Sequence, residues 1–220
     1  MDAGKTYLSA LKIFTAVYGE YHVSVARALD KLGMATTRTR ENLDLALEAL
    51  EDALTIRCKL LGMDHVDSID TLNNIAGVRL HRHEYVKAVQ DYRAVLDRRT
   101  IIFGSSHPSC AVAAFAIGWI LDTHLQQKEE SRIYYKFALS ICRQNGMEHS
   151  SQAREIMKQL ANHRPNSASQ FPDPEVIFRK DLVTANQRSG RAASPQNKLH
   201  LREQNLKRPR VRSKITRFEI

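Results

Sequence analysis

The sequence predicts an all-α fold, a right-handed superhelical solenoid of antiparallel helix pairs, on two observations. A glycine and a histidine three residues apart recur four times, as Gly19/His22, Gly62/His65, Gly104/His107 and Gly146/His149. The successive histidines are 43, 42 and 42 residues apart, and a fixed period in this range is typical of stacked supersecondary units. The segments between the pairs carry apolar residues at helical spacing and few prolines or glycines. Each repeat is therefore expected to be helix, turn, helix.

The period divides most of the chain into repeats. We expect a half repeat at 5–21, full repeats at 22–64, 65–106 and 107–148, and a closing helix at 149–163. Together these segments, residues 5–163, form the predicted helical repeat domain. A terminal helix of a solenoid needs a polar outer face, which fits the composition of 149–163.

Local signals place the individual helices. Apolar stripes predict helices over 5–18, 25–37, 41–61 and 152–162. Pro108 indicates a helix start, where its missing N–H costs nothing. Either Asp67 or Ser68 is expected to cap the first helix of the second full repeat, and either Ser150 or Ser151 the closing helix. The apolar run 110–121 is too short for a membrane span and predicts a buried helix. The acids of 41–61 are expected on a solvated outer face, and they are Glu41, Asp44, Glu48, Glu51 and Asp52.

Residues 164–220 differ in composition and are predicted to be a disordered basic tail. They hold 13 Lys/Arg and 5 Asp/Glu, five prolines and little apolar periodicity. A basic cluster lies near their end, at Lys207, Arg208, Arg210, Arg212 and Lys214. Such a cluster suits a nuclear import signal, a nucleic-acid contact or an acidic lipid surface, and equally a solvated chain end.

Nothing in the sequence indicates an enzyme, a cofactor or a metal. The three cysteines are odd in number and far apart, which fits a reducing compartment. The recurring histidines cannot converge on one ion, because neighbouring helices pack about 8–10 Å apart and ligand distances are near 2 Å. No secretory signal or transmembrane segment is evident, so we expect a cytoplasmic protein, or a nuclear one if the basic cluster is an import signal. His81-Arg82-His83 is expected in an exposed turn.

The helix pairs resemble tetratricopeptide repeats. That pattern places small residues where two helices cross and an aromatic residue four positions after a small one. Here the small residues are Gly33, Ala76 and Gly118 on first helices and Ala46, Ala88 and Ser131 on second helices, followed by Leu50, Tyr92 and Tyr135. Leu50 departs from the aromatic pattern. The period and the string ALTIRCKLLGMDHVDSIDTLNNIAGV are most similar to kinesin light chains and nephrocystin-3-like proteins. The heptad coiled coil of a kinesin light chain is not found before Tyr7.

The resemblance implies a concave groove lined by the first helix of each repeat. An asparagine matching Asn74 holds the backbone of an extended peptide in related repeats, and an amide suits this because it both donates and accepts. The implied groove residues are Arg27, Lys31, Asn73, Asn74, Phe115, Trp119, Arg154 and Lys158. Their charges favour an acidic peptide. Core packing explains Phe115 and Trp119 equally well, and the charged residues also suit a plain solvated surface.

The resemblance therefore implies an adaptor that holds a short, acidic peptide segment of another protein. Two alternatives stay open: a nuclear or nucleic-acid-associated protein that binds through its tail, and a fragment of a longer repeat protein. Deleting 164–220 separates groove from tail. Asn74→Ala is expected to abolish peptide binding with little loss of stability.

Overall fold

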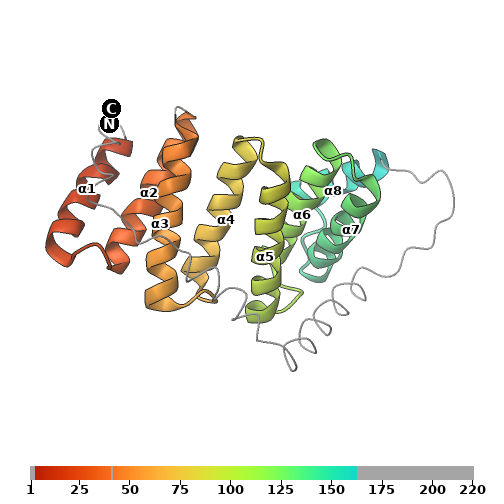
Figure 1. Cartoon of the computed structure of the whole chain (residues 1–220). Helices are drawn as coiled ribbons and strands as arrows, with labels where there is room; N and C mark the ends of the chain where they lie inside the picture. Colours follow the sequence, from red (N-terminus) through yellow and green to blue (C-terminus); the bar gives the residue numbers. More distant parts are fainter. Residues whose placement is uncertain (1–2, 41, 163–220) are drawn as a thin grey trace, which may run out of the picture. The chain divides into compact units, whose positions relative to one another are not determined.

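The computed structural model describes residues 3–40 and 42–162. All regular structure in these ranges is α-helical (Figure 1). The helices are α1 (Ala3–Tyr18), α2 (Val23–Thr39), α3 (Leu43–Leu61), α4 (Val66–His81), α5 (Tyr85–Phe103), α6 (Pro108–Thr123), α7 (Lys128–Gln144) and α8 (Ser151–Asn162). The predicted all-α class and the expected helix positions are confirmed. The predicted tail and its basic cluster lie outside the described residues.

These residues divide into two compact units, 3–91 and 92–162, with the boundary inside α5. In the N-terminal unit, α1 packs on α2, α2 on α3 and α3 on α4. The apolar stripes seen in the sequence form its core. Leu11, Val25, Leu29, Ala53 and Ile56 are at most 2% exposed.

The C-terminal unit is built in the same way from α6, α7 and α8. α7 packs against both α6 and α8. The apolar run 110–121 forms the buried α6, as predicted, with Ile117 and Leu121 in the core. Tyr135 and Ile141 of α7 and Ile156 of α8 complete this core and are almost fully buried.

Two helix pairs, α2/α3 and α6/α7, cross at a glycine. A Cβ atom on Gly33 of α2 would lie 2.8 Å from Leu50 Cγ and 3.0 Å from the Ala46 carbonyl oxygen of α3. A Cβ atom on Gly118 of α6 would lie 3.0 Å from the Tyr135 ring of α7. The small residues predicted at the crossing points are therefore confirmed in both pairs, and Leu50 occupies the place that an aromatic ring fills in the other.

The structure explains why glycine and histidine recur together. The four glycines end helices with φ between 67° and 89°, a region that other residues rarely adopt. His22, His65 and His107 are the N-caps of the next helices, and each Nδ1 atom accepts a hydrogen bond from the backbone N–H two residues later. In these three turns the glycine follows one helix and the histidine caps the next.

Two local expectations were wrong and one is confirmed. The cap of α4 is His65 rather than Asp67 or Ser68, because the chain enters the helix two or three residues earlier than expected. Asp52 is only 6% exposed, so it does not belong to the solvated acidic face of α3. Ser150 caps α8, since its Oγ atom accepts a hydrogen bond from Ala153 N–H at 3.1 Å.

Candidate peptide-binding surface

In the N-terminal unit, the predicted groove residues lie on the solvent-facing stripes of α2 and α4. Arg27 and Lys31, one turn apart on α2, are exposed. Asn73 and Asn74 of α4 are half-buried, between buried Leu72 and Ile75. α2 and α4 contact each other directly. The structure thus brings two cationic side chains and two amides onto neighbouring first helices.

A hydrogen bond joins the two stripes. Asn74 Nδ2 donates to Asp30 Oδ1 at 3.1 Å. The Asp30 side chain is only 7% exposed and lies 3.5 Å from Arg57 Nη1 of α3. A carboxylate can only accept hydrogen bonds, so the amide orientation of Asn74 is fixed, with its carbonyl oxygen turned away from Asp30.

Arg57 connects this pair to the start of α4. Its Nη1 atom donates to the Asp67 carbonyl oxygen at 2.9 Å and to the Thr71 hydroxyl. Both Arg57 and Thr71 are buried. Burying a charge is costly unless it is paired and hydrogen-bonded, and here one guanidinium serves a carboxylate, a carbonyl and a hydroxyl. Asn74 is therefore held by a buried polar network.

The C-terminal unit repeats one part of this arrangement. Arg99 of α5 occupies the position of Arg57 one period later, and its Nη1 atom donates to the Ser109 carbonyl oxygen of α6 at 3.2 Å. An arginine near the end of a second helix thus contacts the first turn of the next first helix in both units. The sequence period could have revealed this pair, since Arg57 and Arg99 are 42 residues apart.

The remaining predicted groove residues lie in the C-terminal unit. Phe115 and Trp119 of α6 are half-buried, with Phe115 against the Tyr135 ring at 5.8 Å between centroids and Trp119 edge-on to His124 at 5.1 Å. Arg154 and Lys158 of α8 are exposed. The two aromatic residues are thus neither fully buried nor free of packing contacts.

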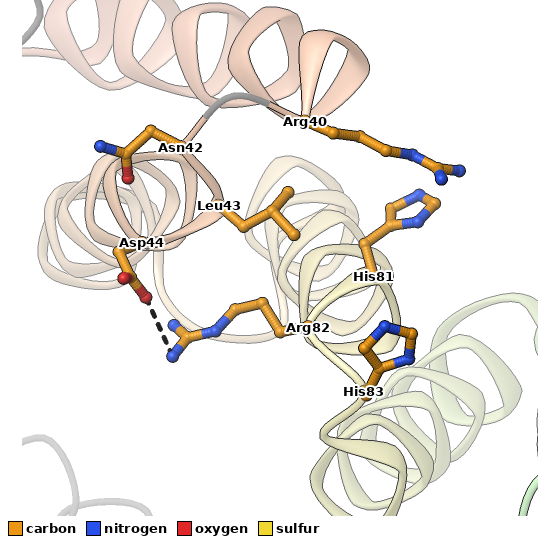
Figure 2. A pocket seen from close by; sticks show the side chains of 7 residues that line it. All are labelled: Arg40, Asn42, Leu43, Asp44, His81, Arg82 and His83. Carbon is orange, nitrogen blue, oxygen red and sulfur yellow. Dashed lines mark ion pairs between the residues drawn. The ribbon is translucent and has the colours of Figure 1, made fainter.

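An open pocket of about 600 Å³ lies at the edge of the N-terminal unit. It is formed by the end of α2, the start of α3 and the end of α4, and Arg40, Asn42, Leu43, Asp44, His81, Arg82 and His83 line it (Figure 2). Figure 2 shows the Arg40 guanidinium beside the His81 ring. Arg82 is paired with Asp44 at 3.0 Å and with Glu84 at 2.9 Å.

The surroundings of His81 in the pocket lower the pKa of its ring. Partial burial lowers its pKa, and the nearby charges of Arg40 and His83 lower it further. Arg40 itself has no ion pair among residues 3–40 and 42–162. His81 and His83 are exposed, as expected from the sequence. The position of Arg40 beside them was not predicted.

Other site chemistry is sparse. Within the part of the chain that the structure describes, no three His, Cys, Asp or Glu side chains are grouped as metal ligands would be. Cys110 and Cys142 are buried, which raises the pKa of both thiols. None of the helices α1 to α8 is long and apolar enough to cross a membrane.

Comparison with known proteins agrees with this architecture. The sequence is 29% identical over 155 residues to the clustered mitochondria protein homolog of Emericella nidulans and 28% identical to that of Neosartorya fischeri, covering 70% of this chain in both cases. The chain spans only about 12% of the length of these curated relatives.

Two solved structures share the fold at 16% sequence identity. One is a Podosopora anserina protein described as a putative kinesin light chain with nearly identical TPR-like repeats. Its TM-score is 0.54, and the match covers 73% of this chain and 84% of that chain. The other is BtubC (BKLC) from P. vanneervenii, with a TM-score of 0.55 over 77% and 78%. The family model for the tetratricopeptide repeat matches residues 1–59 and 67–144. The chain therefore belongs to the tetratricopeptide repeat family.

Proposed function

We propose that this protein is a non-enzymatic adaptor that binds a short, acidic peptide segment of another protein on the first helices of its repeats. Tetratricopeptide repeats are protein-interaction scaffolds, and the family match supports this general role. The observation that carries the finer proposal is the placement of Asn74. It is a half-buried amide on a solvent-facing stripe, with its orientation fixed by a buried carboxylate.

The fixed amide suits a peptide backbone. One N–H of Asn74 is used by Asp30, which leaves the carbonyl oxygen to accept from a backbone N–H and the second N–H to donate. Because the network already holds this side chain, binding a peptide costs little of its conformational entropy. We also propose Asn73, half-buried at the adjacent position of α4, as a contact residue.

The charges favour an acidic segment. Arg27 and Lys31 are exposed on the stripe of α2, and the nearby Asp30 is neutralised by Arg57. In the C-terminal unit, Arg154 and Lys158 supply the same sign of charge, while Phe115 and Trp119 offer apolar surface. We propose that these four residues form a second contact surface for the same kind of ligand.

The names of the relatives refer to mitochondrial clustering but identify no binding partner. A part in mitochondrial clustering would be a property of whole proteins of which this chain spans about 12%. We propose a cytoplasmic location, and a nuclear one if the cluster from Lys207 to Lys214 acts as an import signal. Binding of nucleic acid or acidic lipid through that cluster stays a sequence prediction.

Peptide selection tests the proposal directly. A random 12-residue library displayed on phage would be selected against the full chain, and the affinity of the enriched peptides measured by fluorescence anisotropy. We expect peptides rich in Asp and Glu. The double variant Arg27→Ala/Lys31→Ala should weaken them by about two- to fivefold per charge, the range of exposed ion pairs.

The matched control removes two charges elsewhere. Lys128→Ala/Arg143→Ala changes exposed residues at the two ends of α7, a second helix, and should leave the affinity unchanged. A chain without 164–220 should also bind normally. If no peptide is enriched, the groove does not carry the function. The same conclusion follows if deletion of 164–220 abolishes binding while Arg27→Ala/Lys31→Ala leaves it unchanged.

A further inference from the structure

We propose that the pocket lined by Arg40 and His81 binds a carboxylate side chain of the peptide, about three residues along from the peptide unit that contacts Asn74. This inference rests on the proposed function, because it assigns one ligand position within the same bound segment. It names two residues that neither the repeat pattern nor the predicted groove contains.

Helix geometry places His81 on the peptide-facing stripe. Asn74 and His81 are seven residues apart on α4, which is nearly two full turns, so their side chains share one face. Along the helix axis they are about 10 Å apart. An extended chain advances about 3.3 Å per residue, so this separation corresponds to about three peptide residues.

One cationic side chain of the pocket, Arg40, is not paired with a carboxylate among the described residues. Arg82 is already paired with Asp44 and Glu84, whereas Arg40 has no ion pair among the described residues. The Arg40 guanidinium and the His81 ring lie side by side and line one open cavity (Figure 2). A planar guanidinium with unused donors is well suited to a carboxylate.

Helix ends bring the side chains of the pocket together. Arg40 and His83 adopt positive φ angles, of 58° and 62°. Both lie where a helix ends, and a left-handed residue is a common way for a helix to end. Here they place two cationic or titratable side chains at the mouth of the same pocket, Arg40 where α2 ends and His83 in the turn after α4.

Binding of a carboxylate should make protonation of the His81 ring more favourable. The other charged or titratable residues that line the pocket with His81 are Arg40 at the end of α2, Asp44 of α3, and Arg82 and His83 after α4. Arg82 is paired with Asp44 and with Glu84. In the free protein the charges of Arg40 and His83 disfavour imidazolium. An added anion between Arg40 and His81 opposes that effect, so affinity should rise as the pH falls from 8 to 6.

Library selection against variants of the full chain tests the assignment. The same random 12-residue library is selected against the natural protein, Arg40→Gln and His81→Ala. For the natural protein we expect Asp or Glu at one fixed position of the enriched peptides. That preference should disappear with either variant, while the rest of the selected sequence is retained. Arg143→Gln, an exposed arginine in the last turn of α7, is the matched control.

A double-mutant cycle then links the two partners. Replacing the fixed Glu of a selected peptide by Gln should weaken binding to the natural protein about fivefold, and should have no effect on Arg40→Gln. The loss should be larger at pH 6 than at pH 8. Enriched peptides with no acidic preference, or with one that both variants keep, would overturn this inference and leave the proposed function standing. If no peptide is enriched at all, the proposed function itself fails, and the inference fails with it.

Discussion

The Asp30 carboxylate of α2 accepts a hydrogen bond from Asn74 of α4 at 3.1 Å, joining side chains 44 residues apart in the sequence. The same carboxylate pairs with Arg57 of α3. One buried acid therefore links three consecutive helices of the N-terminal unit. It also fixes the amide that we propose for peptide binding, so stability and binding are coupled at this point.

Asn74→Ala should destabilise the protein as well as weaken peptide binding. The sequence alone predicts little loss of stability, but the hydrogen bond to Asp30 changes that expectation. Removing the donor leaves a buried carboxylate oxygen with one partner fewer, at a cost of about 1–2 kcal/mol. Urea unfolding followed by circular dichroism measures the difference.

Asn73→Ala is the matched control for that experiment. Asn73 is equally half-buried on α4, and its amide makes no hydrogen bond with the other described residues. We expect a change within about 0.5 kcal/mol, as for surface substitutions away from special features. Equal losses in the two variants would show that the Asp30 contact does not stabilise the fold.

Gly33→Ala should destabilise the N-terminal unit although alanine is the better helix former. The intrinsic gain is about 1 kcal/mol, but the added Cβ atom would lie 2.8 Å from Leu50 Cγ and 3.0 Å from a carbonyl oxygen. Overpacking of this kind costs about 1–3 kcal/mol. We expect a net loss in denaturant unfolding.

A cycle with Leu50→Ala identifies the cause of that loss. If the clash with Leu50 is responsible, Gly33→Ala should cost clearly less in the Leu50→Ala background, since residues in contact are not additive. The backbone contact with Ala46 would remain in both backgrounds. Additive effects would mean that the backbone, rather than Leu50, limits the approach of α2 and α3.

The repeat period predicted the helices, and the resemblance to tetratricopeptide repeats predicted their crossing points. Only small residues fit where two helices approach closely, as at Gly33 and Gly118. A small residue at a fixed position of each repeat can be read directly from the sequence. The caps were harder to predict, since serine and aspartate are the usual N-caps. His65 takes this place because its Nδ1 atom reaches the Asp67 N–H across one residue.

The candidate site was predicted only in part, because its polar network joins residues from three helices. Asp30, Arg57 and Asn74 have no common spacing, and their contact depends on how α2, α3 and α4 pack. Likewise, Arg40 and His81 meet in a pocket formed by turns of two successive repeats. A sequence pattern within one repeat does not show that these two side chains come together in space.

His65→Ala should cost about 1 kcal/mol of stability, the usual value of an N-cap side chain. His65→Asn should retain most of it, because the asparagine oxygen can accept from the same first-turn N–H groups. Thermal and urea unfolding of both variants measure the difference. His149→Ala is the control, since Ser150 rather than His149 caps α8. Equal stability of the alanine and asparagine variants would count against a capping role.

Thiol labelling should separate the three cysteines. Cys110 and Cys142 are buried, and burial raises the pKa of both thiols, so little thiolate is present at pH 8. Cys58 is only half-buried. With a chromogenic disulfide reagent we expect one faster reaction in the native protein, and its loss in Cys58→Ser. Three equal rates would contradict the packing of α6 and α7.

The titration of His81 tests the electrostatics of the Arg40 pocket in the free protein. Burial first, and then the charges of Arg40 and His83, lower its pKa below 6.5. The unfolded chain therefore binds more protons at pH values just below 6.5, so the contribution of His81 to stability is lost as the pH falls. NMR titration of the ring Cε1–H should give a midpoint below 6.5, and Arg40→Gln should move it upward. Because the ring is exposed, the change in stability with pH should be small. An unchanged midpoint in Arg40→Gln would mean that the guanidinium does not face His81, and the carboxylate subsite would lose its geometric basis.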